Sequence, residues 1–300
     1  MRALLSLLFG SVMLLAAVAP AAATVSVVDD TGATVTLKQP ARRIATLSPH
    51  AAELVHAAGA GGYLIGVSEF SDYPASVKTL PSLGSSAALD IERILALKPD
   101  LIVAWSSGNS AKQLARLKQM GFPVYQSEPR NFETIATSLE RLSRLTGTEK
   151  TGNEEARRFR QHWQELSARY QGRPPVRVFY QIWRAPLMTF NDSHLVSQAL
   201  RLCGGQNIFG HLPHLAPVVS MEAVLQANPQ AIITTGEGES DPLAGWRRLT
   251  QLDAVKHNNL FLLDPDLIHR ATPRVLTGVQ ALCDHLETAR DAYSTLLRPN

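Results

Sequence analysis

One stretch of this 300-residue sequence is repeated 130 positions further along the chain. Residues 89–105, LDIERILALKPDLIVAW, and residues 219–236, VSMEAVLQANPQAIITTG, each have the pattern of a short helix, a proline and a buried strand. The matching positions are Glu92 and Glu222, Leu95 and Leu225, Pro99 and Pro229, and Ile102 and Ile232. A repeat distance of 130 positions indicates two copies of one domain, because the repeats of solenoid proteins are only about 20–50 residues long.

Short apolar strands alternate with helical segments in both halves of the chain. In the first half the expected strands lie at residues 43–47, 64–68, 101–105 and 123–126. The pattern restarts with VRVFYQIW at residues 176–183, and a separate hairpin is expected at residues 25–37 around Asp-Asp-Thr-Gly. Strands that alternate with helices are typical of a parallel sheet covered by helices. We therefore expect an α/β fold of two similar Rossmann-like lobes with mainly parallel sheets.

A long polar segment, residues 146–172, separates the two halves and carries no strand pattern. Its apolar residues recur three or four positions apart, as Ala156, Phe159, Trp163, Leu166 and Tyr170. This spacing predicts a helix of about 25 residues with one apolar face. The expected organisation is an N-terminal lobe over residues 24–146, a linking helix over 147–173 and a C-terminal lobe over 174–300.

The first 23 residues have the pattern of a cleavable signal peptide. One early positive charge is followed by an apolar run from Leu4 to Val18 and by the small residues Ala21-Ala22-Ala23. The apolar run is shorter than the roughly 18–20 residues that span a bilayer, so a retained membrane anchor is the weaker alternative. No cysteine stands at the end of this run, which excludes a lipid-modified N-terminus. We expect a soluble periplasmic protein that begins near Thr24.

Export changes the interpretation of the two cysteines, Cys203 and Cys283. In an oxidising compartment two lone cysteines favour a disulfide. The closed loop of about 80 residues would stabilise the fold by about 4 kcal/mol in the chain-entropy estimate. Metal binding by two thiols without a neighbouring cluster is the alternative.

The sequence lacks the common signatures of catalysis and of nucleic-acid binding. The net charge is only +3 and is scattered, with no basic run interleaved with aromatic residues, so no nucleic-acid partner is expected. The motifs GxSxG and HExxH and the P-loop are absent. His211 and His214 could ligate a metal, but two histidines without a third ligand are a weak signal. We expect neither a catalytic site nor a resident metal or cofactor.

Aromatic residues gather in the loops that follow the expected strands. These loops contain Phe70, Tyr73, Trp105, Trp183 and Phe190, although aromatic residues make up only 6% of the chain. Open parallel sheets bind ligands beyond the carboxyl ends of their strands, and two facing lobes would turn those ends into a cleft. Aromatic rings in such a cleft suit a large, flat ligand. The alternative is that each ring caps the core at the end of its strand.

The repeated glutamates have both a structural and a functional interpretation. Glu92 and Glu222 each follow a good helix N-cap residue, Asp90 and Ser220. A carboxylate in the first helical turn is favoured by the helix dipole by about 0.3–1 kcal/mol, which explains the pair without any function. One carboxylate on each lobe would also make a two-point acidic surface, which a partner with two arginines could recognise.

The sequence resembles periplasmic substrate-binding proteins of ABC importers, in the long-helix class that serves uptake of cobalamin, haem and iron–siderophores. It is most similar to the cobalamin-binding, BtuF-like members. The resemblance covers nearly the whole chain after residue 23 and is carried by RIATLSPHAAELVHAAG, GVSEFSDYP, LDIERILALKPDLIVAW, LCGGQNIF and RATPR. It implies two lobes joined by one long helix, with the ligand cleft between them.

The resemblance also implies roles for two pairs of residues. Glu92 and Glu222 match the glutamates that contact arginines of the permease in that family. Cys203 and Cys283 match the cysteines of its inter-helix disulfide.

In the ligand site the resemblance is partial. Phe70 and Trp105 keep the aromatic character of the cobalamin binders, and Asp266 and Arg270 match polar cleft positions. Ser86, Met188 and Ala216 stand where the family has larger rings, and Trp183 is expected to compensate. The expected ligand-binding residues are Phe70, Tyr73, Trp105, Trp183, Met188, Asp266 and Arg270.

The expected function is that of a monomeric, non-catalytic carrier. It would capture a large tetrapyrrole-like molecule, first of all a cobalt corrinoid such as cobalamin, and deliver it to an ABC permease of the inner membrane. Haem or a ferric siderophore is the alternative ligand, for which Arg184 and Arg270 would be the discriminating residues. A periplasmic enzyme on the same two-lobed scaffold is the alternative of another class.

Overall fold

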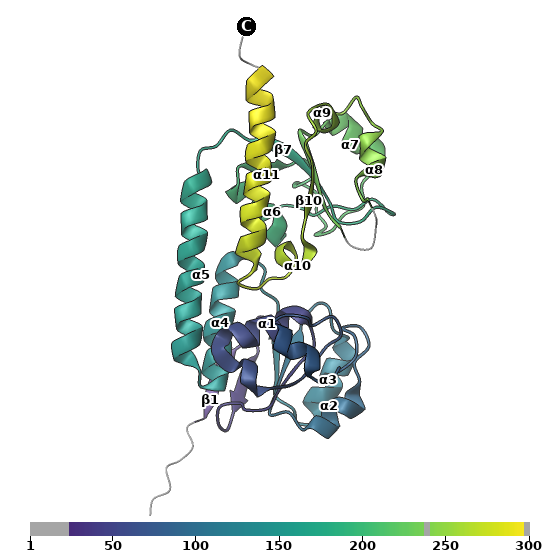
Figure 1. Ribbon diagram of the computed structural model, residues 1–300. Helices are drawn as coiled ribbons and strands as arrows, with labels where there is room; N and C mark the ends of the chain where they lie inside the picture. The colour runs from purple at the N-terminus through teal and green to yellow at the C-terminus, as the bar shows by residue number, and fades with distance from the viewer. Residues whose placement is uncertain (1–23, 237–240, 297–300) are drawn as a thin grey trace, which may run out of the picture.

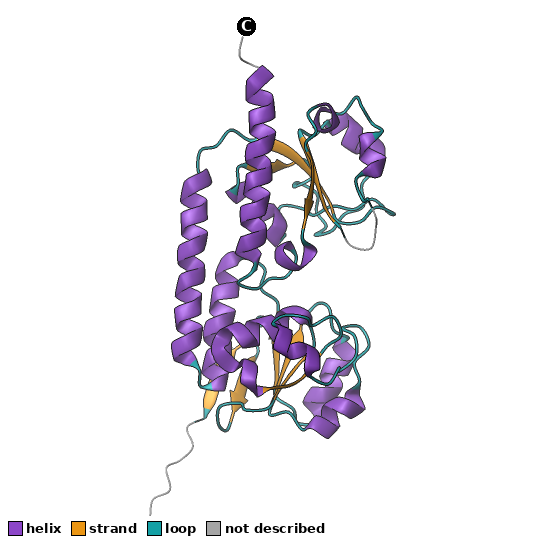
Figure 2. Ribbon diagram, viewed as in Figure 1, coloured by secondary structure: helices purple, strands orange, loops and turns teal. Residues whose placement is uncertain are grey.

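The computed structural model describes residues 24–236 and 241–296 and consists of two α/β lobes (Figures 1 and 2). Each lobe holds a four-stranded sheet in which every strand pair is parallel. The N-terminal strands are β3 (Ile44–Thr46), β4 (Leu64–Val67), β5 (Leu101–Trp105) and β6 (Val124–Ser127). The C-terminal strands are β7 (Val176–Gln181), β8 (Gly205–Asn207), β9 (Ala231–Thr235) and β10 (Leu260–Leu263). The fold class expected from the sequence is confirmed.

The two lobes have the same strand order, which confirms the duplication. The N-terminal order is β4-β3-β5-β6, and the C-terminal order read from its other edge is β8-β7-β9-β10. The repeated helices are α2 (Ile91–Leu97) and α7 (Met221–Ala227), and each ends at a left-handed residue, Lys98 at φ 49° and Asn228 at φ 42°. The two copies of the repeat therefore share the left-handed residue that ends the helix and the strand that follows it.

Both sheets are covered by helices on their two faces, as parallel sheets usually are. In the N-terminal lobe α2 and α3 (Ala111–Gln119) pack on one face, and α1 (Pro49–Val55) and α4 (Phe132–Thr146) pack on the other. In the C-terminal lobe the two layers are α6 (Leu195–Leu202) with α11 (Val275–Leu296), and α7 with α8 (Ala244–Arg247) and α9 (Asp253–Lys256). A short helix, α10 (Pro265–Ile268), follows β10.

The lobes are joined through α5 (Glu149–Tyr170), the long helix that the sequence predicts. Its apolar face is buried at Ala156, Phe159, Leu166 and Tyr170, and Trp163 stacks on Phe132 with ring centroids 5.2 Å apart. The expected helix from residue 146 is wrong at its start, because Gly147 adopts a left-handed conformation (φ 63°) and ends α4 there.

The long helix does not stand alone. No helix is predicted at residues 128–145, but α4 occupies most of them and packs along α5 (Figure 1). Arg160 of α5 clamps the pair: its Nε donates to Glu133 at 3.0 Å and its Nη1 to Glu140 at 2.5 Å. The 22 residues of α11 make it as long as α5, and one continuous core runs along these helices from lobe to lobe.

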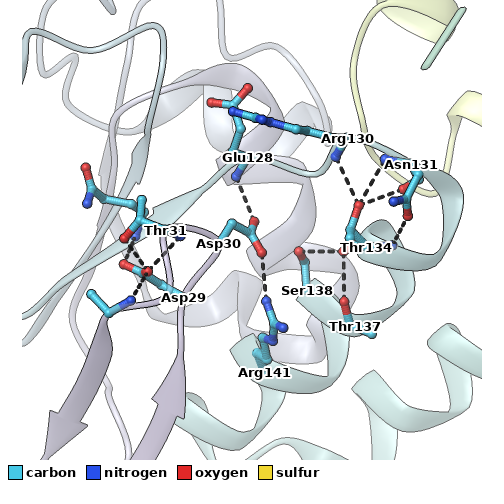
Figure 3. Close-up of polar contacts among 12 residues, drawn as sticks. Asp29, Asp30, Thr31, Glu128, Arg130, Asn131, Thr134, Thr137, Ser138 and Arg141 are labelled. Carbon is cyan, nitrogen blue, oxygen red and sulfur yellow. Dashed lines mark hydrogen bonds and ion pairs between the residues drawn. The ribbon is translucent and has the colours of Figure 1, made fainter. Parts of the chain in front are cut away.

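The predicted hairpin is present as β1 (Val25–Val28) and β2 (Thr34–Leu37), and its turn is tied to the N-terminal lobe (Figure 3). The carboxylate of Asp30 accepts from the backbone N–H of Glu128 and from Arg141 of α4, both at 2.7 Å. In the same view Asn131 caps α4 by accepting from the N–H of Thr134. The hairpin therefore holds the end of β6 and α4 together.

The predicted signal peptide, residues 1–23, lies outside the described residues. Within residues 24–236 and 241–296, none of the helices combines the length and the apolar composition needed to cross a membrane.

Candidate functional site

The carboxyl edges of the two sheets face each other, and one arginine connects them. Arg270 follows β10 and α10 in the C-terminal lobe. Its Nη1 donates to Glu53 of α1, which follows β3, at 2.9 Å and to Asp72, in the loop after β4, at 2.6 Å. Because all strands within a sheet are parallel, contacts between these loops place both carboxyl edges at one inter-lobe surface.

Five charged side chains form the inter-lobe network: Glu53, Asp72, Asp266, Arg270 and Arg274. Glu53 is buried, and its Oε2 accepts from Thr272 at 2.9 Å and pairs with Arg274 at 3.3 Å. Asp266 pairs with Nη2 of Arg270 at 2.6 Å. Burial acts to raise the pKa of Asp72, but the hydrogen bond and charge of Arg270 outweigh it and hold that pKa below its usual value.

Asn109 organises the N-terminal side of this surface. Its buried side chain accepts from the N–H of Trp105 at 2.7 Å and donates to the carbonyls of Leu47 and Ser86 at 2.9 and 2.8 Å. The indole of Trp105 lies against Gly108, where any Cβ would overlap the ring. One buried amide thus links the residue after β3 to the end of β5, where the partly exposed Trp105 lies.

Phe70 is exposed to solvent and has an unusual, left-handed backbone conformation. The ring is 81% exposed, and the residue has φ 63°, a left-handed conformation that aromatic residues rarely adopt. The Phe70 carbonyl lies 3.5 Å from Nη2 of Arg270, within reach of a hydrogen bond. Strain of this kind is often found where a side chain must be held in a particular direction for binding.

The C-terminal lobe contributes an apolar row made of Trp183, Met188 and Val218. Antiparallel bridges pair Trp183 with Met188 and Met188 with Val218. Directly paired residues of antiparallel strands project to the same face, so the three side chains line up. Trp183 is 58% exposed, and its Nε1 donates to the carbonyl of Ala185 at 3.0 Å. The row is an apolar platform at the end of β7.

Buried histidines support the platform and the facing edge. Phe190 stacks on His194 and on Tyr180, and the Tyr180 hydroxyl lies 3.0 Å from Nε2 of His269. Burial lowers the pKa of His194 to about 3, aided by the charge of His269, and lowers the pKa of His269 to about 4. In the N-terminal lobe burial, with the charge of Arg270, lowers the pKa of His50 to about 4. These imidazoles are therefore neutral at pH 7.

Comparison with known proteins identifies the chain. Residues 44–267 match the periplasmic binding protein family, which is about three quarters of the sequence. The chain belongs to the periplasmic binding protein family. It is 39% identical over 252 residues to the vitamin B12-binding protein of Vibrio cholerae serotype O1, covering 84% of this chain and 91% of the relative. It is 37% identical over 254 residues to the protein of the same name from Vibrio parahaemolyticus serotype O3:K6, covering 84% and 92%.

Solved structures of periplasmic binding proteins have the same architecture. The crystal structure of the periplasmic vitamin B12-binding protein BtuF of Vibrio cholerae matches with a TM-score of 0.77 and 39% identity, over 84% of this chain and 98% of that chain. The periplasmic haem-binding protein HutB of Vibrio cholerae matches with a TM-score of 0.70, over 81% and 98%. At 20% identity, the second likeness establishes the fold alone.

In this periplasmic binding protein the predicted ligand residues lie in or beside the inter-lobe network and at strand ends. Asp266 and Arg270 are in the inter-lobe network, while Phe70, Trp105, Trp183 and Met188 lie at strand ends. Tyr73 contacts the inter-lobe network: its ring stacks under Arg274, 4.0 Å from the guanidinium carbon. It also lines a pocket of about 430 Å³ with Glu53, His56, Glu155 and Thr277. Phe190 is partly buried in the histidine cluster, as the core-capping alternative expects.

Three residues of the inter-lobe surface, Glu53, Asp72 and Asn109, are not among the site residues predicted from the sequence. Their roles depend on partners far along the chain, such as Arg270 for Glu53 and Leu47 for Asn109. His211 lines a pocket of about 380 Å³ beside β8. Within residues 24–236 and 241–296, no three His, Cys, Asp or Glu side chains are placed to hold a metal ion.

The two repeated glutamates are exposed in the first turns of α2 and α7. The predicted caps are present, since Asp90 accepts from the N–H of Arg93 and Ser220 from that of Ala223. In the view of Figure 1, α2 and α7 lie on the side of the molecule opposite α5, one on each lobe.

The predicted disulfide is confirmed. Cys203 at the end of α6 is bonded to Cys283 in α11, with 80 residues between the two positions. Both cysteines are buried, so the bond lies within the core of the C-terminal lobe.

Proposed function

We propose that this protein is a periplasmic carrier that captures a corrinoid, cobalamin or a close relative, and delivers it to an ABC permease of the inner membrane. The observation that carries the proposal is the pair of exposed aromatic side chains at the facing strand ends, Phe70 on one lobe and Trp183 on the other. Contiguous apolar patches on soluble proteins mark binding sites, and Trp183 lies in a row with Met188 and Val218. The 39% identity to proteins named for vitamin B12 binding gives these rings a ligand class.

The geometry suits a large ligand with a flat face. A single aromatic side chain can bury about 150–250 Å², so Phe70 and the Trp183 platform together could cover both sides of a macrocycle. Met188 and Val218 extend the platform with flexible, apolar contact area. These residues would bind and orient the ligand and exclude water, and no covalent step is needed.

The state of Arg270 favours a corrinoid over haem or a ferric siderophore. An anionic ligand would require a cation that is free to pair with it. Arg270 is instead bonded to three carboxylates, Glu53, Asp72 and Asp266. A corrinoid whose side chains are amides makes no such demand, because amides bind without a counter-charge.

Glu92 and Glu222 are proposed as the contacts to the permease. Each lies in the first turn of a capped helix on an exposed surface, so little backbone freedom is lost when a partner binds. Two contacts on two lobes would also fix the orientation of the carrier, since the second contact forms at high effective concentration.

Calorimetry with cyanocobalamin and haemin tests the ligand class. We expect cyanocobalamin to bind and Trp183→Ala to weaken it by about 1–3 kcal/mol, from the apolar contact that is lost. Met120→Ala is the matched control, because Met120 is also exposed but lies at the end of α3. Binding of haemin with no binding of cyanocobalamin would contradict the proposal.

Binding to the permease in nanodiscs tests the docking contacts. Glu92→Gln and Glu222→Gln should leave corrinoid affinity unchanged and weaken permease binding, with the double variant affected most. Glu154→Gln, on the exposed side of α5, removes the same charge and should change neither. Permease affinity that survives in the double variant would refute this role for the pair.

A further inference from the structure

The inter-lobe network holds more carboxylates than cations. Glu53, Asp72 and Asp266 contribute three negative charges, and Arg270 and Arg274 contribute two positive ones. Every carboxylate of the network is within 3.3 Å of a guanidinium nitrogen. Both cations are therefore paired, and the five side chains of the network together carry one net negative charge, with Lys78 also acting on Asp72.

The surplus charge is on the exposed side of the network. The Arg270 side chain is only 15% exposed, whereas those of Asp72 and Asp266 are 43% and 40% exposed. A molecule that enters between the lobes meets these two carboxylates and not the guanidinium behind them. The neighbouring His50 adds no positive charge, because its buried ring is neutral at pH 7.

We propose that Asp72 and Asp266, backed by Glu53, act as a charge filter that admits uncharged amide-bearing corrinoids and rejects corrinoids or porphyrins that carry carboxylates. This inference rests on the proposed corrinoid-binding function and adds the property of the ligand that the site selects. Asp72 and Asp266 are specificity-determining residues in this scheme, and Glu53 is a positioning residue that keeps Arg270 occupied.

The physical basis is repulsion combined with the pairing of Arg270 to three carboxylates. A ligand carboxylate near the network would be repelled by Asp72 and Asp266, and it could pair with Arg270 only by displacing one of them. Between two low-dielectric lobes the field is focused, so a single ligand charge at roughly 8–10 Å should change the affinity by about two- to tenfold at low salt. The effect should shrink as salt screens the charges.

The experiment uses ligands that match in shape and differ in one charge. These are cyanocobalamin and its three monocarboxylates, each with a different propionamide hydrolysed. With the unmodified protein in 20 mM salt, we expect each acid to bind more weakly than the amide, by about tenfold for the acid nearest the network. In 500 mM salt the difference should fall to about twofold or less.

Two exposed variants then test the assignment. Asp72→Asn and Asp266→Asn each keep the side-chain shape, remove one negative charge and leave Arg270 better able to pair with the ligand. Each should narrow the preference for the amide by about two- to fivefold. The matched control is Glu154→Gln on α5, where the same charge is lost outside the network and the preference should not change. Thermal melts of each variant report whether the fold is retained.

The possible outcomes of these binding experiments distinguish failure of the charge filter from failure of the proposed corrinoid-carrier function. If all three acids bind within twofold of cyanocobalamin to the unmodified protein, the filter is refuted and the corrinoid carrier stands. The same conclusion follows if neither Asp72→Asn nor Asp266→Asn changes the preference. If the protein prefers the acids, or binds haemin in place of cyanocobalamin, the filter is refuted and, in the second case, the proposed function with it.

Discussion

Acidification from pH 7.5 to pH 5 should destabilise this protein through three buried histidines. Burial lowers the pKa of His50 to about 4, that of His194 to about 3 and that of His269 to about 4. Arg270 adds to the effect on His50, and His269 to that on His194. Nδ1 of His194 also accepts a hydrogen bond from the N–H of Val196 at 3.1 Å, which a protonated ring could not do.

The sign and size of the effect follow from linkage. An unfolded histidine has a pKa of about 6.5 and takes up a proton as the pH falls below that value, whereas the folded rings stay neutral until about pH 4. The stabilisation is therefore complete above pH 6.5 and is lost progressively as the pH falls towards 4. At pH 5 each histidine should have lost about 2 kcal/mol. The total is about 4–6 kcal/mol, because His194 and His269 titrate together.

Urea unfolding at pH 7.5, 6.5, 5.5 and 5.0 measures this loss. The informative variant is His194→Asn, because asparagine is a good N-cap residue that can accept from Val196 and has no proton to gain. It should remove about 2 kcal/mol of the pH-dependent loss, and His162→Asn, at an exposed position of α5, should remove none. An unfolding free energy that is flat between pH 7.5 and 5, or that falls equally in His194→Asn, would refute the reasoning.

Three further predictions concern the scaffold and the N-terminal edge. Replacing Cys203 and Cys283 together by alanine should lower the free energy of unfolding by about 4 kcal/mol in urea titrations, and a loss below about 1 kcal/mol would contradict the loop-closure estimate. Gly108→Ala should displace the ring of Trp105 and shift its fluorescence, whereas an unchanged spectrum would mean that the ring does not lie against Gly108. Asn109→Ala should cost about 1–3 kcal/mol because it leaves a buried N–H and two carbonyls without their partner, and a loss under 0.5 kcal/mol would argue against that role.

Local patterns in the sequence predict most of the fold. Buried strands and turns are specified by residues close together, so the repeat could be recognised from pairs such as Ile102 and Ile232, both of which are fully buried in matching strands. Helix α4 also has local signals. Asn131 caps it, and Phe132, Ile135 and Leu139 recur at helical spacing and are buried. The predicted long helix corresponds to α5 alone, and α4, which is not predicted, packs along it.

Site residues were harder to predict than strands. The position of a ring at a strand end indicates the right edge of the sheet, but not which way the loop turns. Phe70 itself adopts a left-handed conformation and is exposed, while Tyr73, three positions on, stacks under Arg274 of the inter-lobe network. Phe190 was predicted with the same logic as Trp183, yet its ring packs into the histidine cluster while that of Trp183 is exposed.

Local patterns do not predict how the two lobes are oriented. That orientation brings the site residues together. Glu53 and Arg270 are 217 positions apart, and their contact joins the two facing edges. The continuous core along α4, α5 and α11 makes a second, independent connection. A hydrogen bond between charged groups contributes about 1.5–3 kcal/mol, so a lobe movement that parts Arg270 from Glu53 must be offset by ligand contacts. A ligand that fits against Phe70 and Trp183 without parting them avoids this cost, and the lobes should therefore move little on binding.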